Sequence, residues 1–353
     1  MGMLERNDLY IGYKLIEDIH SPNHGLLLKK GSVLTHKEVR RLSRFNISIS
    51  SYMDVLQEPR QAFYDHVNKQ VNQFKSDFDR FGEDQSRLKI VESDVIPTLT
   101  KLANDIDIQV LMLSMKSHDD YTYRHNIAVS MLAAKLATWL GYSDSKVNRI
   151  AFCGLLHDIG KTRIPSEILN KTDKLTQNEF AIMKHHTTFG YTMLREQGFE
   201  EDALRVALEH HEREDGSGYP AGKKSEEIHP YAKIIAIVDC FHAMTSDRSY
   251  RHALSFYEAL IQLQTDAFGK LDPKKTMTFI YHIMQSSIGS FVELSDGRQG
   301  VIKFIPIETP IFPYIEVEGD IVTTATSNLF INKFTDPKEI DLTEKGEWRG
   351  ARK

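Results

Sequence analysis

The sequence predicts a multidomain α+β protein in which a long helical region lies between two small β-rich segments. Apolar residues recur at helical spacing through residues 110–288, whereas residues 1–60 and 289–335 contain short β-branched runs interrupted by turn-forming residues. The 353 residues are 41% hydrophobic and 26% charged, which is typical of globular proteins and excludes collagen-like or wholly disordered chains. At this length, two or three domains are expected rather than one.

Residues 1–60 are expected to form a small β-rich accessory domain, because the apolar runs there are broken at Gly25 and Gly31. Residues 61–109 are expected to form a helical connector. Its first part carries an apolar stripe at steps of three and four residues, beginning at Phe63. This stripe predicts a helix packed within its own domain, and the same pattern also suits a helix that connects domains or forms a homodimer.

The helical region, residues 110–288, is divided where the apolar period stops at Gly141 and Gly198, as expected for residues that end helices. Histidine is concentrated here, since ten of the 15 histidines lie between His118 and His252. In several of the expected helices, an apolar stripe ends in a histidine or an aspartate. Functional side chains are therefore expected in this region.

The C-terminal residues return to a β-rich pattern. FVELS and GVIKFI flank Asp296 and Gly297, a pair that predicts a hairpin turn within a small C-terminal domain, residues 289–335. The last residues, 336–353, are polar and are expected to form a tail.

Charge and cysteine content restrict the class of protein. With 44 Lys and Arg against 49 Asp and Glu, the formal net charge is −5, which argues against a protein that binds nucleic-acid polymers through a basic surface. The two cysteines, Cys153 and Cys240, are too few for a disulfide scaffold. No apolar run is long enough to span a membrane, and the N-terminus lacks the apolar core of a signal peptide. A cytoplasmic protein is therefore expected.

Seven side chains of the helical region form a candidate set of metal ligands. One buried histidine is more often a satisfied core residue than a ligand, and a buried carboxylate is costly unless it is paired or coordinated. Taken together, the seven nitrogen and oxygen donors are typical of Mn, Fe, Co, Ni or Zn sites rather than Ca or Mg sites. They exceed the needs of one ion, which predicts two ions about 4 Å apart that activate a bridging water and hold a phosphoryl group. The set is His125, His157, Asp158, His186, His210, His211 and Asp239.

Two further segments indicate a phosphate-bearing substrate. In HHEREDGSGYP, Gly218 and Pro220 belong to a tight turn that presents Tyr219 directly after two of the histidines. Such a turn could simply end a helix, but its position favours a role in substrate binding. Arg248 and Arg251 stand three residues apart, and two guanidiniums beside a metal centre suit phosphate oxygens, although on a lone helix they would form a solvated face.

With these segments, the sequence resembles the HD-GYP family, a subgroup of HD-domain metal-dependent phosphohydrolases whose members hydrolyse the bacterial second messenger cyclic di-GMP. The resemblance covers about residues 110–285 and rests on HNIAVS, LLHDIGKTRIP, KHHTTFG, HHEREDGSGYP and VDCFHAMTSDRSYR in the family's order. It implies that residues 110–288 are an all-α HD-type catalytic domain flanked by the two β-rich domains. It also implies two divalent metal ions, Fe or Mn first, with Zn, Co or Ni as alternatives.

The resemblance also implies roles for individual residues. It places the metal ligands on the seven residues above, with His186 preferred to His185 because the family histidine stands four residues before a glycine, here Gly190. It makes Asp158 the bridge between the ions and puts Lys161 beside the bridging hydroxide and the scissile phosphate. The implied substrate-binding residues are Gly218, Tyr219, Pro220, Arg248 and Arg251.

Three positions depart from the family pattern. Tyr121 stands where some members have a glutamate that binds a third metal, which favours a two-metal site. His242 replaces a second carboxylate that is common after Asp239, and Ser249 replaces a proline. The last two changes bear on substrate positioning, and neither removes an expected metal ligand.

The sequence therefore predicts a metal-dependent phosphodiesterase that opens cyclic di-GMP to pGpG, with a second cut giving GMP. Three alternatives stay open: a non-catalytic cyclic-dinucleotide receptor, a phosphodiesterase for another cyclic dinucleotide, and a di-iron oxygenase of HD type. The GYP turn and the arginine pair do not favour the oxygenase. The flanking domains could bind protein partners in bacterial signalling.

Overall fold

The computed structural model describes residues 91–105, 121–246, 253–327 and 329–335, together with Leu111 and short stretches and single residues between 13 and 75. The chain divides into two compact units, residues 1–70 and 71–353, and each is described by itself.

The described part of the first unit contains two short antiparallel strand pairs. β1 (Lys14–Leu15) pairs with β4 (Leu56–Gln57), and β2 (Ile19–His20) pairs with β3 (Leu26–Leu28). Eight buried apolar side chains from this segment, including Leu15, Ile19 and Leu28, form a small cluster of their own. The β-rich character expected for the N-terminal segment is thereby confirmed, and its predicted boundary at residue 60 stays a prediction.

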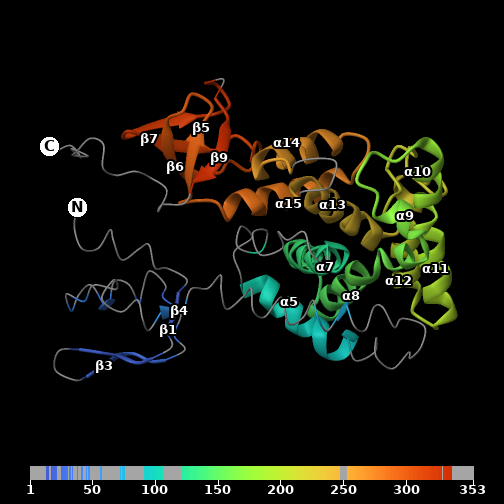
Figure 1. Ribbon diagram of the computed structural model, residues 1–353. Helices are drawn as coiled ribbons and strands as arrows, with labels where there is room; N and C mark the ends of the chain where they lie inside the picture. Colours follow the sequence, from blue (N-terminus) through green and yellow to red (C-terminus); the bar gives the residue numbers. More distant parts are fainter. Residues whose placement is uncertain are drawn as a thin grey trace. The chain divides into compact units, whose positions relative to one another are not determined.

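Helices form most of the second unit (Figure 1). A π-helical turn, η3 (Val91–Val95), precedes α5 (Ile96–Asp105). The other described helices are α7 (Tyr121–Trp139), α8 (Asp144–Leu156), the 3₁₀ helix η4 (Ile159–Arg163), α9 (Ser166–Leu169), α10 (Gln177–Lys184), α11 (His186–Glu196), α12 (Glu201–Glu209), the 3₁₀ helix η5 (Ser225–Glu227), α13 (Pro230–Thr245), α14 (Phe256–Asp266) and α15 (Pro273–Gln285).

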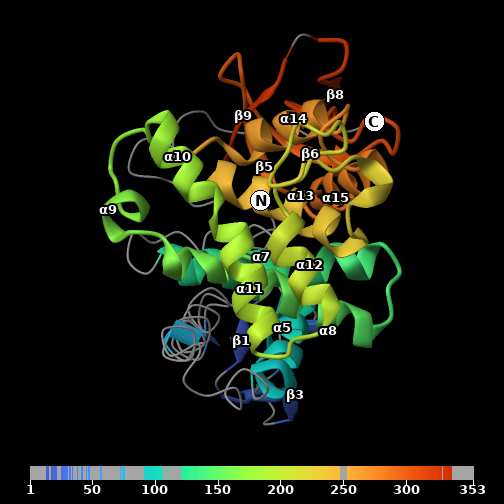
Figure 2. The same cartoon turned by 90° about the vertical axis from the view of Figure 1, so that its right-hand side faces the viewer.

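Helices α7 and α13 form the centre of the helical core (Figures 1 and 2). α7 packs against α5, α8, α13 and α15, and α13 also packs against α12 and α14. Both central helices are apolar around most of their circumference, so that the whole of 127–134 and of 234–239 is buried. The few polar side chains of these helices are therefore held in an apolar environment.

The helix boundaries follow local signals in the sequence. Gly141 and Gly198 take positive φ angles of 79° and 69° just after α7 and α11, which confirms the two predicted helix ends. Thr176 and Ser255 begin α10 and α14 with capping boxes, in which the hydroxyl accepts from a backbone N–H three residues on.

The C-terminal residues form a five-stranded antiparallel sheet. Its strands are β5 (Phe291–Leu294), β6 (Gln299–Phe304), β7 (Tyr314–Val317), β8 (Asp320–Thr323) and β9 (Ile331–Thr335), in the order β8-β7-β6-β5-β9. The predicted hairpin at Asp296–Gly297 is confirmed, since β5 pairs with β6 across it and Gly297 has a φ of 84°. The predicted fold class, a helical core flanked by β-rich segments, is thereby confirmed.

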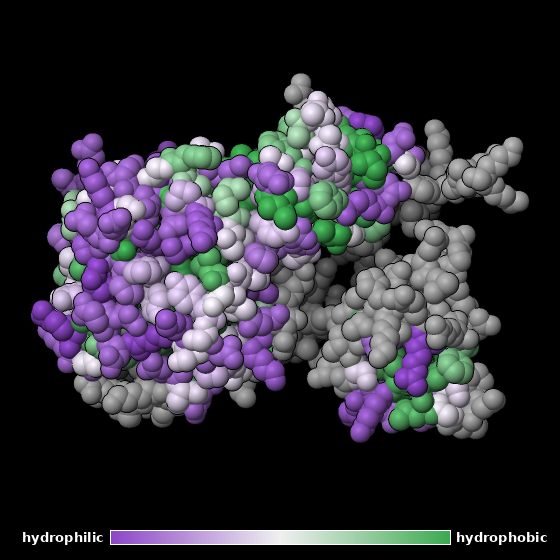
Figure 3. Space-filling view, turned by 180° about the vertical axis from the view of Figure 1, so that it is seen from behind, coloured by the Kyte–Doolittle hydropathy of each residue, from purple (hydrophilic) through white to green (hydrophobic). Residues whose placement is uncertain are grey.

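The sheet packs on the helical core with one face. Burial alternates along β5 and β7, as expected when one face of an antiparallel sheet is covered. The Tyr257 hydroxyl of α14 donates to the carbonyl of Ile311, and the Gln285 amide of α15 donates to the carbonyl of Ile305 at 3.2 Å. Figure 3 shows hydrophobic side chains gathered over the sheet, whereas the helical core presents a mainly hydrophilic surface in that view. None of the described helices has the length and apolar composition needed to cross a bilayer.

We expect Gly160→Ala to destabilise the protein, because η4 and α11 meet backbone to backbone at this position. A Cβ atom on Gly160 would lie 1.9 Å from the carbonyl oxygen of His186 and 2.4 Å from the nitrogen of Gly190. The free energy of unfolding, measured by urea titration, should fall by about 3 kcal/mol.

Gly141→Ala is the matched control. Its Cβ would meet nothing within 4 Å, and only its φ of 79° is unfavourable, so a loss of about 1 kcal/mol is expected. Equal losses in the two variants would contradict the close approach of η4 and α11.

Candidate metal centre

The carboxylate of Asp158 lies at the centre of a buried cluster of histidines. Asp158 follows the end of α8 and is 1% exposed. Its Oδ1 lies 3.4 Å from Nε2 of His186 and 3.7 Å from Nε2 of His210. Its Oδ2 lies 3.3 Å from Nε2 of His157 and 3.7 Å from Nε2 of His125. The two oxygens therefore face two different groups of imidazoles.

Five helices bring the cluster together from distant parts of the chain. α7 supplies His125, the end of α8 supplies His157 and Asp158, α11 supplies His186, the end of α12 supplies His210 and His211, and α13 supplies Asp239. Two of these residues do not contact Asp158 directly but lie in the cluster. The ring of His211 is 4.1 Å from that of His210, and Oδ1 of Asp239 is 3.2 Å from Nε2 of His125. All seven side chains predicted as ligands are thus brought together.

The ends of helices determine how three of the imidazoles are oriented. Nδ1 of His157 lies 2.7 Å from the carbonyl of Gly154, and Nδ1 of His186 lies 2.7 Å from that of Met183. Nδ1 of His210 lies 3.0 Å from the carbonyl of Val206. The last carbonyls of a helix lack backbone donors, so a side chain at the helix end can satisfy them.

These contacts determine which nitrogen of each ring carries the hydrogen. A carbonyl oxygen can only accept, so Nδ1 must donate to it. A neutral imidazole then has a lone pair on Nε2, the atom that faces Asp158 in His157, His186 and His210. This is the arrangement in which histidine binds a metal through Nε2, with the second nitrogen held by an outer partner.

Burial keeps most of these histidines neutral. It lowers the pKa of His210 to about 3 and the pKa of His211 well below its ordinary value, and the neighbouring imidazoles add to both effects. His157 differs, because the attraction of Asp158 outweighs burial and raises its pKa. Neutral imidazoles can bind a cation without first losing a proton.

The two carboxylates stay ionised despite their burial. Burial alone would raise the pKa of Asp158, but His157 and Lys161 outweigh it and hold that pKa well below the ordinary value. Burial would likewise raise the pKa of Asp239, and the hydrogen bond and charge of His125 outweigh it. The cluster therefore combines ionised carboxylates with mainly neutral imidazoles, as a cation site requires.

Two buried polar atoms of the cluster have no hydrogen-bond partner among the described residues, and this is further evidence for a metal site. The two atoms are Nε2 of His157 and Oδ1 of Asp158. Such atoms are costly in a protein interior unless something else satisfies them. Six of the seven side chains, all but Asp239, form two groups that share Asp158, and within each group the possible ligand atoms lie within 4.8 Å of one another. The donor set fits one or more divalent transition-metal ions.

Lys161 and the GYP turn lie where the sequence predicts them, beside the cluster. Nζ of Lys161 in η4 is 2.5 Å from Oδ2 of Asp158, and its side chain is 24% exposed. The Tyr219 ring stacks on the His211 ring with centroids 4.7 Å apart. A Cβ on Gly218 would lie 2.5 Å from the backbone of His211 and of its neighbours, so only glycine fits there.

Two buried glutamates that the sequence reasoning missed hold this turn. Glu212 is 2% exposed and accepts from the backbone N–H groups of Ala221 and Lys223 at 2.7 and 2.9 Å. Glu209 is 1% exposed, pairs with Arg205 and Lys223, and accepts from the backbone N–H of His229. Their positions in the sequence could have indicated this role. Glu209 directly precedes HHEREDGSGYP at the end of α12, and Glu212 lies within that segment.

Some predicted residues are not placed. Arg248, Arg251 and Ser249 lie outside the described residues. Tyr121 is the first residue of α7. His242, which also departs from the family pattern, is 1% exposed, and its Nδ1 lies 2.9 Å from Nδ1 of His125.

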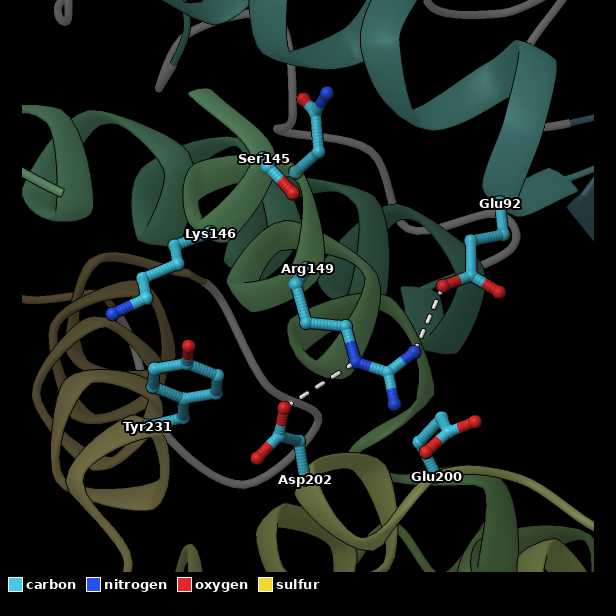
Figure 4. A pocket seen from close by; sticks show the side chains of 8 residues that line it. Glu92, Ser145, Lys146, Arg149, Glu200, Asp202 and Tyr231 are labelled. Atoms are coloured by element: carbon cyan, nitrogen blue, oxygen red, sulfur yellow. Dashed lines mark hydrogen bonds and ion pairs between the residues drawn. The ribbon is translucent and has the colours of Figure 1, made fainter. Parts of the chain in front are cut away.

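A charged hollow of about 650 Å³ lies elsewhere on the helical core (Figure 4). Arg149 crosses it and pairs with Glu92 at 2.8 Å and with Asp202 at 3.5 Å. None of the seven clustered residues lines this hollow. It is therefore separate from the candidate metal centre.

Comparison with known families agrees with this geometry. Residues 109–274 match the model of the HD domain family. This segment is thus similar in sequence to HD domains. The match confirms, at the level of that family, the resemblance found in the sequence motifs, and it contains every residue of the cluster.

Several curated proteins are similar to about half of this chain. The chain is 38% identical over 192 residues to the cyclic di-GMP phosphodiesterase PA4108 of Pseudomonas aeruginosa, covering 54% of this chain and 46% of that protein. It is 37% identical over 175 residues to a cyclic di-GMP phosphodiesterase of Thermotoga maritima, covering 49% and 48%. It is 36% identical over 170 residues to the 3′3′-cGAMP-specific phosphodiesterase 1 of Vibrio cholerae, covering 47% and 39%. The chain thus spans about half or less of the length of these relatives.

The stability of the metal-free protein should fall as the pH is lowered from 7 to 4.5. In the unfolded chain His210 takes up a proton near pH 6.5, whereas burial keeps it neutral in the folded protein down to a pKa of about 3. Acid therefore favours unfolding through this window, by about 3 kcal/mol at pH 4.5 for this residue alone.

Urea titrations of chelator-treated protein at several pH values measure this effect. The His210→Gln variant should show a shallower fall of unfolding free energy with acid than the unmodified protein. The same slope in both proteins would contradict the burial of a neutral His210.

Proposed function

We propose that this chain is a metal-dependent phosphodiesterase that hydrolyses cyclic di-GMP. The observation that carries the proposal is the carboxylate of Asp158, whose two oxygens face separate groups of imidazoles. Asp158 and five histidines form two candidate ligand groups, and Asp239 joins them through its contact with His125. Curated relatives of the HD domain that are named cyclic di-GMP phosphodiesterases support the choice of reaction and substrate.

We propose a binuclear centre in which Asp158 is a ligand to both ions. His186, His210 and His211 would hold one ion on the Oδ1 side. His125, His157 and Asp239 would hold the other, because His125 and His157 lie on the Oδ2 side and Asp239 contacts His125. Fe or Mn are the proposed metals, with Zn, Co or Ni as alternatives that suit the same donors.

Divalent ions bound at this centre would supply a water of lowered pKa and would offset negative charge on phosphate oxygens. The chain's own residues have separate tasks. Lys161, which reaches Asp158 from a partly exposed position, would offset the charge that develops on the phosphate during attack. Tyr219 and its turn would contact the nucleotide, and Arg248 and Arg251 would bind its phosphates.

The reaction is a hydrolysis of a phosphodiester. Water oxygen bonds to phosphorus, the bond from phosphorus to the 3′ oxygen breaks, and that oxygen leaves with a proton. One such step opens the ring to pGpG, and a second step on the linear product gives GMP. No oxidant or further co-reactant is needed.

A second candidate substrate is the hybrid dinucleotide 3′3′-cGAMP. The similarity to a 3′3′-cGAMP-specific phosphodiesterase supports it, at an identity close to that of the cyclic di-GMP phosphodiesterases. Both substrates present the same phosphodiester to the cluster, so they differ only in one base.

We expect the Asp158→Ala variant to lose bound metal and at least 1000-fold in turnover, because it removes the carboxylate shared by both ligand groups. Product chromatography after incubation of anaerobically Mn- or Fe-loaded protein with cyclic di-GMP, together with metal analysis, measures both losses. Asp320→Ala, which removes an exposed carboxylate on the C-terminal sheet, should keep metal and activity.

Each outcome has a defined meaning for the proposal. pGpG or GMP formed by the unmodified protein and not by Asp158→Ala supports it. Product from 3′3′-cGAMP but not from cyclic di-GMP would indicate that 3′3′-cGAMP is the substrate. Binding without turnover in metal-replete protein would indicate a receptor. Oxygen consumption in place of hydrolysis would indicate an oxygenase.

A further inference from the structure

His125 is held differently from the other imidazoles that face Asp158. His157, His186 and His210 stand at helix ends, where carbonyls of the last helical turn accept from their Nδ1 atoms. His125 lies within α7, and its Nδ1 meets another imidazole, that of His242, at 2.9 Å. The outer partner of His125 is therefore a side chain from α13.

His242 is well placed for this contact. It follows Asp239 by three residues on α13, so both side chains are on the same face of the helix. It is 1% exposed, and its ring centroid is 5.0 Å from that of His125. The Ser246 hydroxyl lies 3.4 Å from its Nδ1 and 3.5 Å from its Nε2, so Nδ1 of His125 at 2.9 Å is the nearer partner of Nδ1, and the hydroxyl can accept from Nε2.

We propose that His242 is the positioning residue that holds His125 in its metal-binding tautomer. Two Nδ1 atoms at 2.9 Å share one hydrogen, so one ring donates and the other accepts. In the metal-free protein, Nε2 of His125 can donate to Asp239, 3.2 Å away, but it can bind a cation only once its hydrogen is on Nδ1. His242 then accepts at Nδ1 and carries its own hydrogen on Nε2. This assignment rests on the proposed metal centre.

His242 stands where a carboxylate is common in the HD-GYP family, and the assignment explains why an imidazole can replace it. A carboxylate could also accept from Nδ1 of His125, but it would place a further negative charge beside Asp158 and Asp239 in a buried site. A neutral imidazole provides the acceptor without that charge. The departure at His242 therefore preserves the outer hydrogen bond.

Metal binding by two variants of His242 tests this assignment without reference to turnover. His242→Leu fills a similar volume but offers no acceptor, and its affinity for Mn²⁺ or Zn²⁺ should fall by about 10- to 100-fold. His242→Asn presents an oxygen near the position of Nδ1, and its affinity should stay within about threefold of the unmodified protein. ¹⁵N NMR of Zn-loaded protein should find the His125 hydrogen on Nδ1 and the His242 hydrogen on Nε2.

Three results would overturn the assignment. Unchanged affinity in His242→Leu, or equal losses in the Leu and Asn variants, would leave His242 with a packing role only. A metal-loaded His242 with its hydrogen on Nδ1 would do the same. An unmodified chain that binds no metal would overturn the proposed centre itself, which the same titration detects separately.

Phe180, Lys184 and Tyr219 form a surface beside the cluster, here named the Phe180 shelf. Phe180 and Lys184 are one turn apart on α10, and Phe180 is 46% exposed. Its ring packs edge to face against the Tyr219 ring, and the two ring centroids are 6.4 Å apart. Nζ of Lys184 lies 4.8 Å from the centre of the Phe180 ring and 5.2 Å from that of Tyr219.

The Phe180 shelf is continuous with the candidate metal centre. The Tyr219 ring contacts the rings of both His211 and His186, at 4.7 and 6.4 Å. An exposed aromatic ring and an ammonium group thus lie one ring beyond the clustered imidazoles. A ligand that has its phosphate at the cluster and a flat, polarisable base would cover both.

We infer that the Phe180 shelf binds one purine base and an adjoining phosphate of the cyclic dinucleotide. Bases stack on exposed aromatic rings, and the ammonium of Lys184 provides a charge for a phosphate oxygen. The inference rests on the proposed function, because the phosphodiesterase supplies a ligand that joins base and phosphate.

Steady-state kinetics with variants of Phe180 test the shelf. Phe180→Ala should raise the KM for cyclic di-GMP about tenfold and leave kcat within about twofold, since stacking acts on binding. Phe180→Trp should restore the KM. Phe304→Ala, which removes an exposed ring from the C-terminal sheet, should change neither constant.

A fluorescent substrate analogue separates this inference from the activity itself. A cyclic dinucleotide with 2-aminopurine in place of one guanine loses fluorescence when that base stacks on an aromatic ring. Quenching by the unmodified protein and by Phe304→Ala, but not by Phe180→Ala, would support the shelf even if turnover were absent. An unchanged KM together with unchanged quenching in Phe180→Ala would overturn it.

Discussion

The hydrogen bond from histidine Nδ1 to a carbonyl at a helix end is the interaction on which the candidate centre depends. α8 and α12 each end directly before a histidine of the cluster, and α10 ends two residues before His186. In each case the ring donates to a carbonyl near the helix end, and the same contact directs its Nε2 toward Asp158. Helix termination and ligand orientation are therefore one structural event, and moving a helix end by one residue would lose both.

The packing of the helical core keeps these helix ends together. η4 can follow Asp158 and still contact α11 only because Gly160 has no side chain to separate their backbones. The central helices α7 and α13 bring His125 and Asp239 into a dry environment, where an ionised carboxylate persists only with partners. On the outer side, Glu212 fixes the turn that carries Tyr219. The site is thus bounded by packed helices toward the core and by this turn toward solvent.

Much of this could be predicted from local sequence patterns. The ends of α7 and α11 and the hairpin at Asp296–Gly297 follow from periodicity and turn residues. Among the clustered side chains, those of His157, His210, His211 and Asp239 follow from apolar stripes that end in a histidine or an aspartate. Contacts between distant segments could not be predicted in this way. The meeting of His242 with His125, 117 positions apart, depends on how α7 and α13 pack, and periodicity along one helix does not contain that information. The choice of His186 over His185 likewise needed the spacing of a known family.

The proposed centre requires that one carboxylate, that of Asp158, is shared by two metal sites. Anomalous X-ray diffraction from crystals of Mn-loaded protein tests this sharing. We expect two anomalous peaks, one on the side of Asp158 that faces His186 and His210 and one on the side that faces His125 and His157. A single peak, or two peaks of which one does not contact Asp158, would contradict it.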